Sequence, residues 1–162
     1  DDLAWNCLCV GSLDLAPVYA TSVRQLIDDC DLRERVRLVG ACGPEELGAF
    51  YDGASLFVLP SHYEGYGMAF SEALARGLGI VSTTGGAIPF TVPPGARVLV
   101  PPGDVPALGR ALRGLLTEPA GPVQRAAMAA EAGRCALTLP SWHEAAERFA
   151  DATRELTPDG DV

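Results

Sequence analysis

Short apolar runs alternate with segments of helical periodicity along the first hundred residues. Each run is followed by a glycine, a proline or a polar turn, which is typical of buried strands. The runs predict strands at 8–10, 36–39, 56–59, 80–82 and 98–100. The segments between them place apolar residues three or four positions apart. They predict helices at 17–31, from 44 onward and at 67–76.

Beyond the last apolar run the pattern is helical only. Asp104 is placed to cap one helix, and residues 122–137 predict a second. A third opens at Ser141, with Glu144 at the spacing of a capping box. Strands that are apolar throughout and separated by helices indicate an α/β fold. We therefore expect a doubly wound parallel sheet covered on both faces, Rossmann-like and ending in consecutive helices.

Such folds bind ligands outside the carboxyl ends of their strands. The loop at 60–67 carries the most chemistry there, because it joins a buried strand to a helix through Gly65 and Gly67. Glycines let backbone N–H groups approach a ligand closely, and a helix N-terminus adds partial positive charge. The loop is therefore a candidate anion site made from backbone.

Two carboxylates accompany this candidate anion site. Glu64 lies in the loop, and Glu72 lies about one turn into the helix. Carboxylates repel a phosphate. Their presence beside a phosphate site therefore makes sense only if they bind hydroxyl groups. A phosphate together with gripped hydroxyls suggests a nucleotide joined to a sugar. The alternative is that both glutamates are simply solvated, and the strand–loop–helix pattern alone leaves the two readings even.

Composition narrows the possible partners. The chain has 162 residues, which fits one domain or half of a two-domain protein. Its net charge of −9 argues against nucleic acid or an anionic membrane as the main partner. All 12 basic residues are arginine, which excludes chemistry that needs a lysine of this chain. The five cysteines (7, 9, 30, 42 and 135) are interpreted as reduced core thiols of a cytoplasmic protein.

An ordered set of motifs carries a family resemblance. It comprises Pro60-Ser61, Glu64-Gly65-Tyr66-Gly67, Glu72-Ala73-Leu74, Arg76-Gly77, Gly85-Gly86, Pro101-Pro102-Gly103-Asp104 and the late Trp142. With it the chain resembles the C-terminal, donor-binding half of retaining GT-B-fold glycosyltransferases of the "glycosyl transferases group 1" type. The resemblance implies a nucleotide-sugar-binding domain over residues 1–156, followed by an acidic tail at 157–162.

The resemblance also implies roles. Glu72 would bind the ribose hydroxyls of the donor nucleotide, and Glu64 would contact the transferred sugar as the catalytic candidate. The backbone of Gly65, Tyr66 and Gly67 would hold the diphosphate or the sugar, and the segment 40–42 would lie near the base. A hexosyl group would be transferred with retention of configuration. Preorganised dipoles would stabilise the leaving group, with no metal and no cofactor.

Three departures from the family pattern are visible. Phe90 stands where relatives often carry glutamate, and Gly79 stands where proline is usual. The family's first donor-domain strand, with its arginine and lysine, would precede residue 5. We therefore expect this chain to be a piece of a longer protein whose N-terminal domain binds the acceptor. The isolated chain is expected to be inactive, and any membrane contact to come from the missing parts.

Other functions stay open beside this one. The main alternative is a non-catalytic nucleotide-sugar-binding scaffold or sensor with the same fold. A phosphorylase would need a cofactor-bearing lysine, whereas an epimerase would act without an acceptor. Asp29-Cys30-Asp31 has the spacing of a metal-binding D-x-D motif, but it falls at a predicted helix end. We interpret it as a solvated helix end, and His62 as a surface histidine.

Overall fold

The computed structural model describes residues 5–156, without the side chains at 142, 155 and 156. All five predicted strands are present within one or two residues of their expected bounds. They are β1 (Cys7–Val10), β2 (Val36–Gly40), β3 (Phe57–Leu59), β4 (Ile80–Thr83) and β5 (Arg97–Val100). The mixed α/β class with parallel strands is therefore confirmed.

The predicted helices are also present, and two short elements join them. The helices are α1 (Pro17–Asp29), α2 (Pro44–Gly53), α3 (Met68–Ala75), α4 (Ile88–Thr91), α5 (Val105–Thr117), α6 (Gly121–Ala136) and α7 (Trp142–Leu156). Helix α4 and a 3₁₀ turn, η1 (Pro94–Ala96), were not predicted, because neither is long enough to show a helical period.

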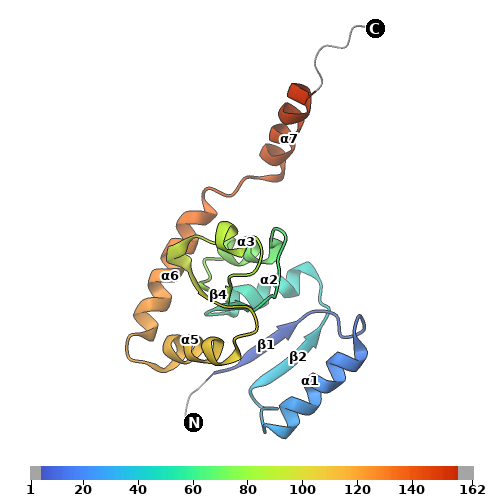
Figure 1. The fold of residues 1–162 in the computed structure, drawn as a ribbon, viewed down its shortest axis with the longest axis vertical. Helices are drawn as coiled ribbons and strands as arrows, with labels where there is room; N and C mark the ends of the chain where they lie inside the picture. The colour runs from blue at the N-terminus through green and yellow to red at the C-terminus, as the bar shows by residue number, and fades with distance from the viewer. Residues whose placement is uncertain (1–4, 157–162) are drawn as a thin grey trace.

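The strands form two parallel sheets, where the sequence predicted one. β1 pairs with β2, and β3, β4 and β5 pair in that order. In Figure 1, β1 lies between β2 and the rest of the domain. Strands β1 and β3 therefore each keep one edge without a strand partner among the described residues.

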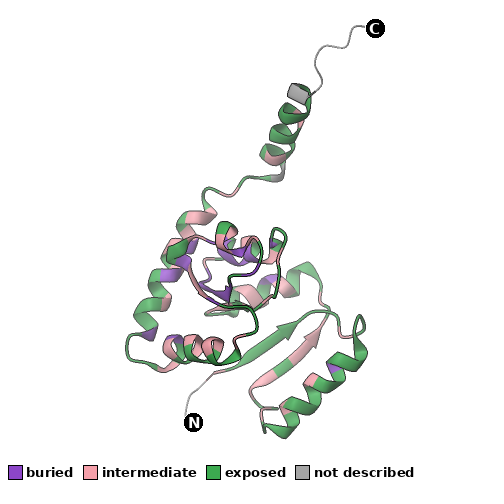
Figure 2. Ribbon diagram, viewed as in Figure 1, coloured by how far each residue is buried: buried purple, intermediate pink, exposed green. Residues whose placement is uncertain are grey.

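The core is built on both faces of β4. Ile80 packs in one apolar cluster with Phe70 and Leu74 of α3. Val81, on the opposite face, packs in a second cluster with Leu115 of α5 and Met128 of α6. Figure 2 shows the buried residues gathered around β4, α3 and α6. This two-sided burial is the doubly wound arrangement that continuous apolar strands predict.

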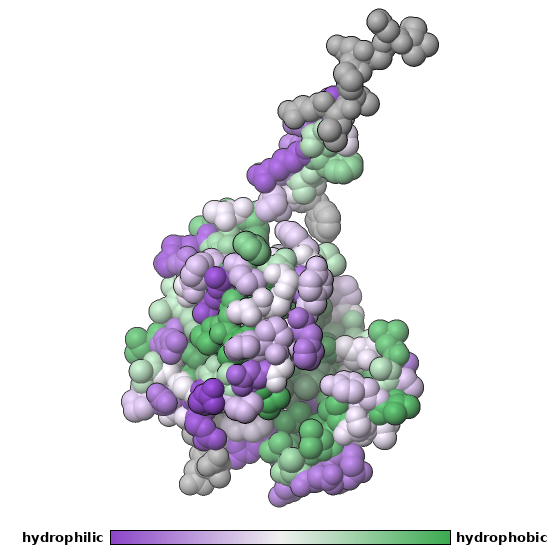
Figure 3. Space-filling view, in the orientation of Figure 1, coloured by the Kyte–Doolittle hydropathy of each residue, from purple (hydrophilic) through white to green (hydrophobic). Residues whose placement is uncertain are grey.

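The unit formed by β1, β2 and α1 is far more exposed. Leu8 and Val10 of β1 and Leu26 of α1 are accessible to solvent. Apolar side chains gather over this part of the surface in Figure 3. The cysteines are free, as expected, but Cys7, Cys9 and Cys30 are exposed. Their interpretation as core thiols is therefore wrong, because nothing among the described residues covers these parts of the unit.

Helix α7 extends away from the body of the domain (Figure 1). It opens with the predicted capping box: the Ser141 N–H donates to the Glu144 carboxylate at 2.7 Å, and the Glu144 N–H donates to Ser141 Oγ at 3.2 Å. The side chain of Trp142, a member of the motif set, and the predicted acidic tail at 157–162 lie outside the part of the chain that the structure describes. Within residues 5–156, no helix is both long enough and apolar enough to span a membrane.

Candidate functional site

The loop from Pro60 to Gly67 connects the end of β3 to the start of α3. Gly67 caps α3 in the left-handed conformation, with φ of 84°. A Cβ at this position would come within 2.5 Å of the Phe70 ring, so only glycine fits. No side chain caps this helix. The first backbone N–H groups of α3 are therefore not bonded by a capping side chain, as an anion site requires.

A second pair of glycines braces the loop from behind. A Cβ on Gly85 would lie 2.4 Å from the His62 carbonyl oxygen, and a Cβ on Gly86 would lie 2.3 Å from the Glu64 carbonyl oxygen. Gly86 also has a positive φ of 61°. Next to it, the Ala87 N–H donates to the Glu64 carbonyl at 2.8 Å. Two backbone segments thus touch directly, which fixes where Glu64 sits.

Hydroxyl groups complete this brace. The buried Thr83 hydroxyl, at the end of β4, donates to the Ser61 carbonyl. It also accepts from the Gly85 N–H at 3.1 Å. On α4, the Thr91 hydroxyl donates to the Tyr66 carbonyl at 2.8 Å. The loop is therefore held by the segment that follows β4.

Glu64 is half-buried within this braced loop. The Ser61 hydroxyl lies 3.4 Å from its Oε2 atom, a long hydrogen bond. Its backbone is fixed on one side by Gly86 and Ala87. The carboxylate is thus carried by a fixed backbone while its oxygens retain capacity to accept further hydrogen bonds.

Glu72 lies on the exposed side of α3. Its Oε2 atom accepts a hydrogen bond of 3.0 Å from the Tyr51 hydroxyl, which comes from α2. Burial, followed by the bond to Glu72, raises the pKa of Tyr51 to about 12. Sequence reasoning missed Tyr51, because it lies 21 positions from Glu72 and no local pattern connects the two residues.

The other candidate positions lie on neighbouring loops. His62 is exposed, and it lies beside Gly103 in the loop after β5. A Cβ added to Gly103 would be 3.5 Å from the His62 Cε1 atom. Gly40 ends β2 with φ of 89°, and its carbonyl accepts from the Gly11 N–H at 2.9 Å. Phe90, on α4, is 90% exposed. The loop 60–67 thus contacts the segment after β4 and the loop after β5, and the end of β2 contacts the end of β1.

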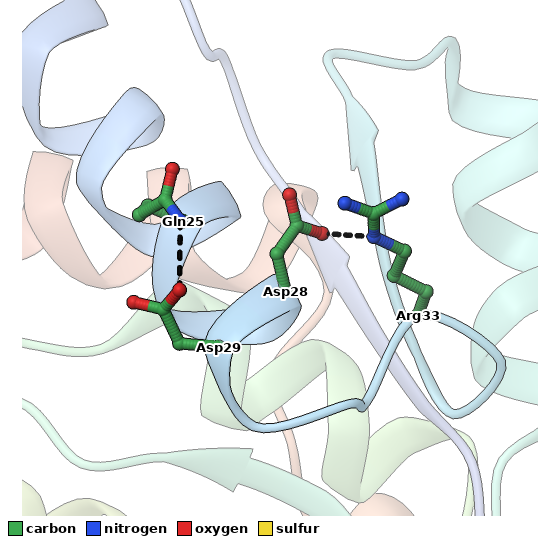
Figure 4. Close-up of polar contacts among 4 residues, drawn as sticks. All are labelled: Gln25, Asp28, Asp29 and Arg33. Atoms are coloured by element: carbon green, nitrogen blue, oxygen red, sulfur yellow. Dashed lines mark hydrogen bonds and ion pairs between the residues drawn. The ribbon is translucent and has the colours of Figure 1, made fainter.

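The D-x-D spacing falls at the C-terminal end of α1, as predicted. The Asp29 carboxylate accepts from Gln25 Nε2 at 2.8 Å, and the neighbouring Asp28 pairs with Arg33 (Figure 4). These carboxylates make hydrogen bonds local to the helix end. Across residues 5–156, no group of three or more His, Cys, Asp or Glu side chains is placed to hold a metal ion.

Known proteins resemble this chain in sequence and in fold. One curated relative is the GDP-mannose-dependent monoacylated alpha-(1-6)-phosphatidylinositol monomannoside mannosyltransferase of Corynebacterium glutamicum. It is 30% identical over 139 residues, which are 81% of this chain and 35% of that protein. The chain spans between about a fifth and a third of the curated relatives it matches.

Solved structures share the fold. Sucrose-phosphate synthase from Thermosynechococcus elongatus superposes with a TM-score of 0.78 at 29% identity, over 92% of this chain and 38% of that one. Anabaena HepE, solved in complex with UDP-glucose, gives a TM-score of 0.81 at 20% identity, over 93% of this chain and 41% of that one. Residues 1–118 match the model of the family described as glycosyl transferases group 1. The chain therefore belongs to the group 1 glycosyl transferases.

Proposed function

We propose that this chain is the donor-binding domain of a retaining hexosyltransferase and binds a nucleoside-diphosphate sugar at the loop 60–67. One observation carries the proposal. The glycine loop, braced by Gly85 and Gly86, leads into a helix N-terminus without a side-chain cap. Glu64 and Glu72 accompany it with carboxylate oxygens that can accept hydrogen bonds.

The roles follow from the chemistry of each group. The N-terminus of α3 and the backbone of Gly65, Tyr66 and Gly67 hold the diphosphate, in a chain without lysine. Glu72 accepts from the ribose hydroxyls, and Glu64 accepts from hydroxyls of the transferred sugar. Because the dipoles are already in place, they stabilise the negative charge that develops on the leaving diphosphate. The proposed reaction needs no metal from this chain.

The division of the sheet supports the proposal that a further strand belongs between its two parts. Strands β1 and β3 each have an open edge, and apolar side chains on the β1 unit are exposed. One further parallel strand between β1 and β3 would join the two sheets and cover open backbone groups. We place such a strand, and an acceptor-binding domain before it, in a longer protein of which this chain is one part.

A calorimetric titration of the full-length protein with UDP, GDP and ADP tests the proposal. The names of the similar proteins given above include both a guanine and a uracil nucleotide, so the titration decides which base this site prefers. Glu72→Ala should weaken binding of the preferred nucleotide about 10- to 100-fold, because hydrogen bonds to a charged group are lost. Glu46→Ala is the matched control, since Glu46 is an exposed carboxylate in the first turn of α2.

Binding that is insensitive to Glu72→Ala would contradict the assigned site, and the absence of binding by all three nucleotides would contradict the proposal as a whole.

Phe90 favours the second candidate function, a binding scaffold without catalysis. Its fully apolar side chain stands exposed on α4, beside the loop. A full-length protein that binds the nucleotide sugar but transfers nothing to any acceptor hydroxyl would support the scaffold.

A further inference from the structure

Tyr51 connects the candidate site to the hydrophobic core. Its hydroxyl donates to Glu72 Oε2 at 3.0 Å. Its ring packs against Phe57 of β3 with the centroids 5.8 Å apart, and Phe57 in turn meets Phe70 of α3 edge-on at 5.8 Å. The position of the hydroxyl is therefore set by aromatic packing rather than by a mobile side chain.

This contact changes what Glu72 can do. An exposed glutamate samples many rotamers, and ordering it on binding costs free energy. The Tyr51 hydroxyl selects one arrangement and occupies one lone pair of Oε2. The rest of the carboxylate stays able to accept hydrogen bonds from a ligand. A tyrosine hydroxyl is protonated and so remains a donor at neutral pH, and here the pKa of Tyr51 is raised further, to about 12.

We propose that Tyr51 is a positioning residue for the ribose end of the nucleotide: it holds the Glu72 carboxylate so that its free lone pairs face the ribose hydroxyls. The inference rests on the proposed function, since it needs Glu72 to bind ribose. It goes further by assigning ribose recognition to a pair of residues on two helices. Tyr51 itself touches no ligand in this account.

A second link between the same helices provides a matched control. Arg76, which caps the C-terminal end of α3 one turn after Glu72, pairs with Asp52 of α2 at 2.5 Å. Its guanidinium also donates to the Gly48 carbonyl at 3.4 Å. Asp52 neighbours Tyr51 in the chain, but its carboxylate pairs with Arg76 and takes no part in the bond from Tyr51 to Glu72. Asp52→Asn therefore weakens the attachment of α2 to α3 without removing the bond that positions Glu72.

The test measures the preference for ribose over deoxyribose. The full-length protein is titrated with the nucleoside diphosphate it prefers and with the 2′-deoxy and 3′-deoxy counterparts. The ratio of dissociation constants, deoxy over ribo, is compared among variants. Tyr51→Phe removes only a hydroxyl and keeps the ring packing. It should lower the larger ratio about 3- to 10-fold, because the carboxylate stays in place and only the hydrogen bond that orients it is lost, an effect of about 1 kcal/mol.

The other variants separate positioning from stability. Glu72→Ala should bring the ratio close to one, and adding Tyr51→Phe to it should cause no further fall, because the two residues act through one contact. Asp52→Asn should leave the ratio within about two-fold of the wild-type value, because Asp52 contacts neither the Glu72 carboxylate nor the proposed ligand. Thermal melts of each variant check that all of them are folded.

Two results would overturn the inference, and they are distinguishable. If Glu72→Ala abolishes the ribose preference while Tyr51→Phe retains it, Glu72 recognises ribose without help from Tyr51. Only the role assigned to Tyr51 is then wrong. If the wild-type ratio is already close to one and Glu72→Ala changes nothing, ribose is not read at this carboxylate. The assignment of Glu72 under the proposed function then fails as well.

Discussion

Replacing Gly86 with alanine tests the backbone brace of the candidate site. Two costs add at this position. A left-handed conformation with φ of 61° costs a residue with a Cβ about 1–2 kcal/mol. The new Cβ would also lie 2.3 Å from the Glu64 carbonyl oxygen and 2.8 Å from the Glu64 nitrogen. Both are backbone atoms, so no flexible side chain can move aside.

The expected loss of stability follows from these contacts. Overpacking of this kind costs about 1–3 kcal/mol, so Gly86→Ala should lower the free energy of unfolding by roughly 2–5 kcal/mol. For a domain of this size, each kcal/mol corresponds to about 2–4 °C in Tm. Urea unfolding followed by circular dichroism measures the loss. Because relief of the clash shifts Glu64, nucleotide-sugar binding should fall too in the fraction that remains folded.

Gly133 supplies the control for this substitution. It lies inside α6, and a Cβ there meets nothing within 4 Å. Gly133→Ala should therefore stabilise the protein by about 0.5–1 kcal/mol through helix propensity. If Gly86→Ala unfolds at the wild-type urea concentration and binds the nucleotide sugar as well as the wild type, the backbone contact with Glu64 does not hold the loop.

Three further predictions concern the core and two titrating groups. Phe70→Ala should cost about 3–5 kcal/mol of unfolding free energy, because the ring is fully buried, whereas Phe90→Ala on the surface should change it by less than about 0.5 kcal/mol; urea melts of the pair should differ accordingly. Glu144 accepts hydrogen bonds at the start of α7, which lowers its pKa below 4.5; helix content should therefore fall as the pH drops below that value, and a Glu144→Gln variant should lack this step in circular dichroism. The raised pKa of Tyr51 contributes stability below pH 10 that is lost as the pH rises toward about 12, and ultraviolet titration should show its ionisation shifted downward in Glu72→Gln.

Local patterns were sufficient for most of the fold. The burial of Phe70 and Leu74 follows from their spacing in a short helix, and the caps at Asp104 and Ser141 follow from single residues a few positions from their partners. The glycine loop was recognisable because a continuous apolar run, which predicts β3, precedes it and a segment with helical spacing, which predicts α3, follows it. Interactions within one turn are encoded in neighbouring residues, so a single sequence displays them.

Long-range contacts were beyond such reasoning. The bond from Tyr51 to Glu72 joins two helices, and the contact of Gly86 with Glu64 depends on how two loops approach. Gly79 is a further case. A Cβ there would lie 2.8 Å from the Met128 Cβ on α6, a close approach between two distant segments that the residues around Gly79 do not reveal. The division of the sheet between β1 and β3 likewise depends on which strands become neighbours, and no strand pattern specifies that.

Hydrogen–deuterium exchange of the full-length protein, with and without its preferred nucleotide sugar, tests the central claim most directly. The account predicts slower exchange at 64–72 and at 85–91, where the loop, the start of α3 and α4 meet. Exchange along α6 (Gly121–Ala136) should not change. Protection that is confined to the hollow lined by Arg24, Arg33 and Arg37, between α1 and β2, would contradict it, because the ligand would then bind a cluster of arginines instead of the glycine loop.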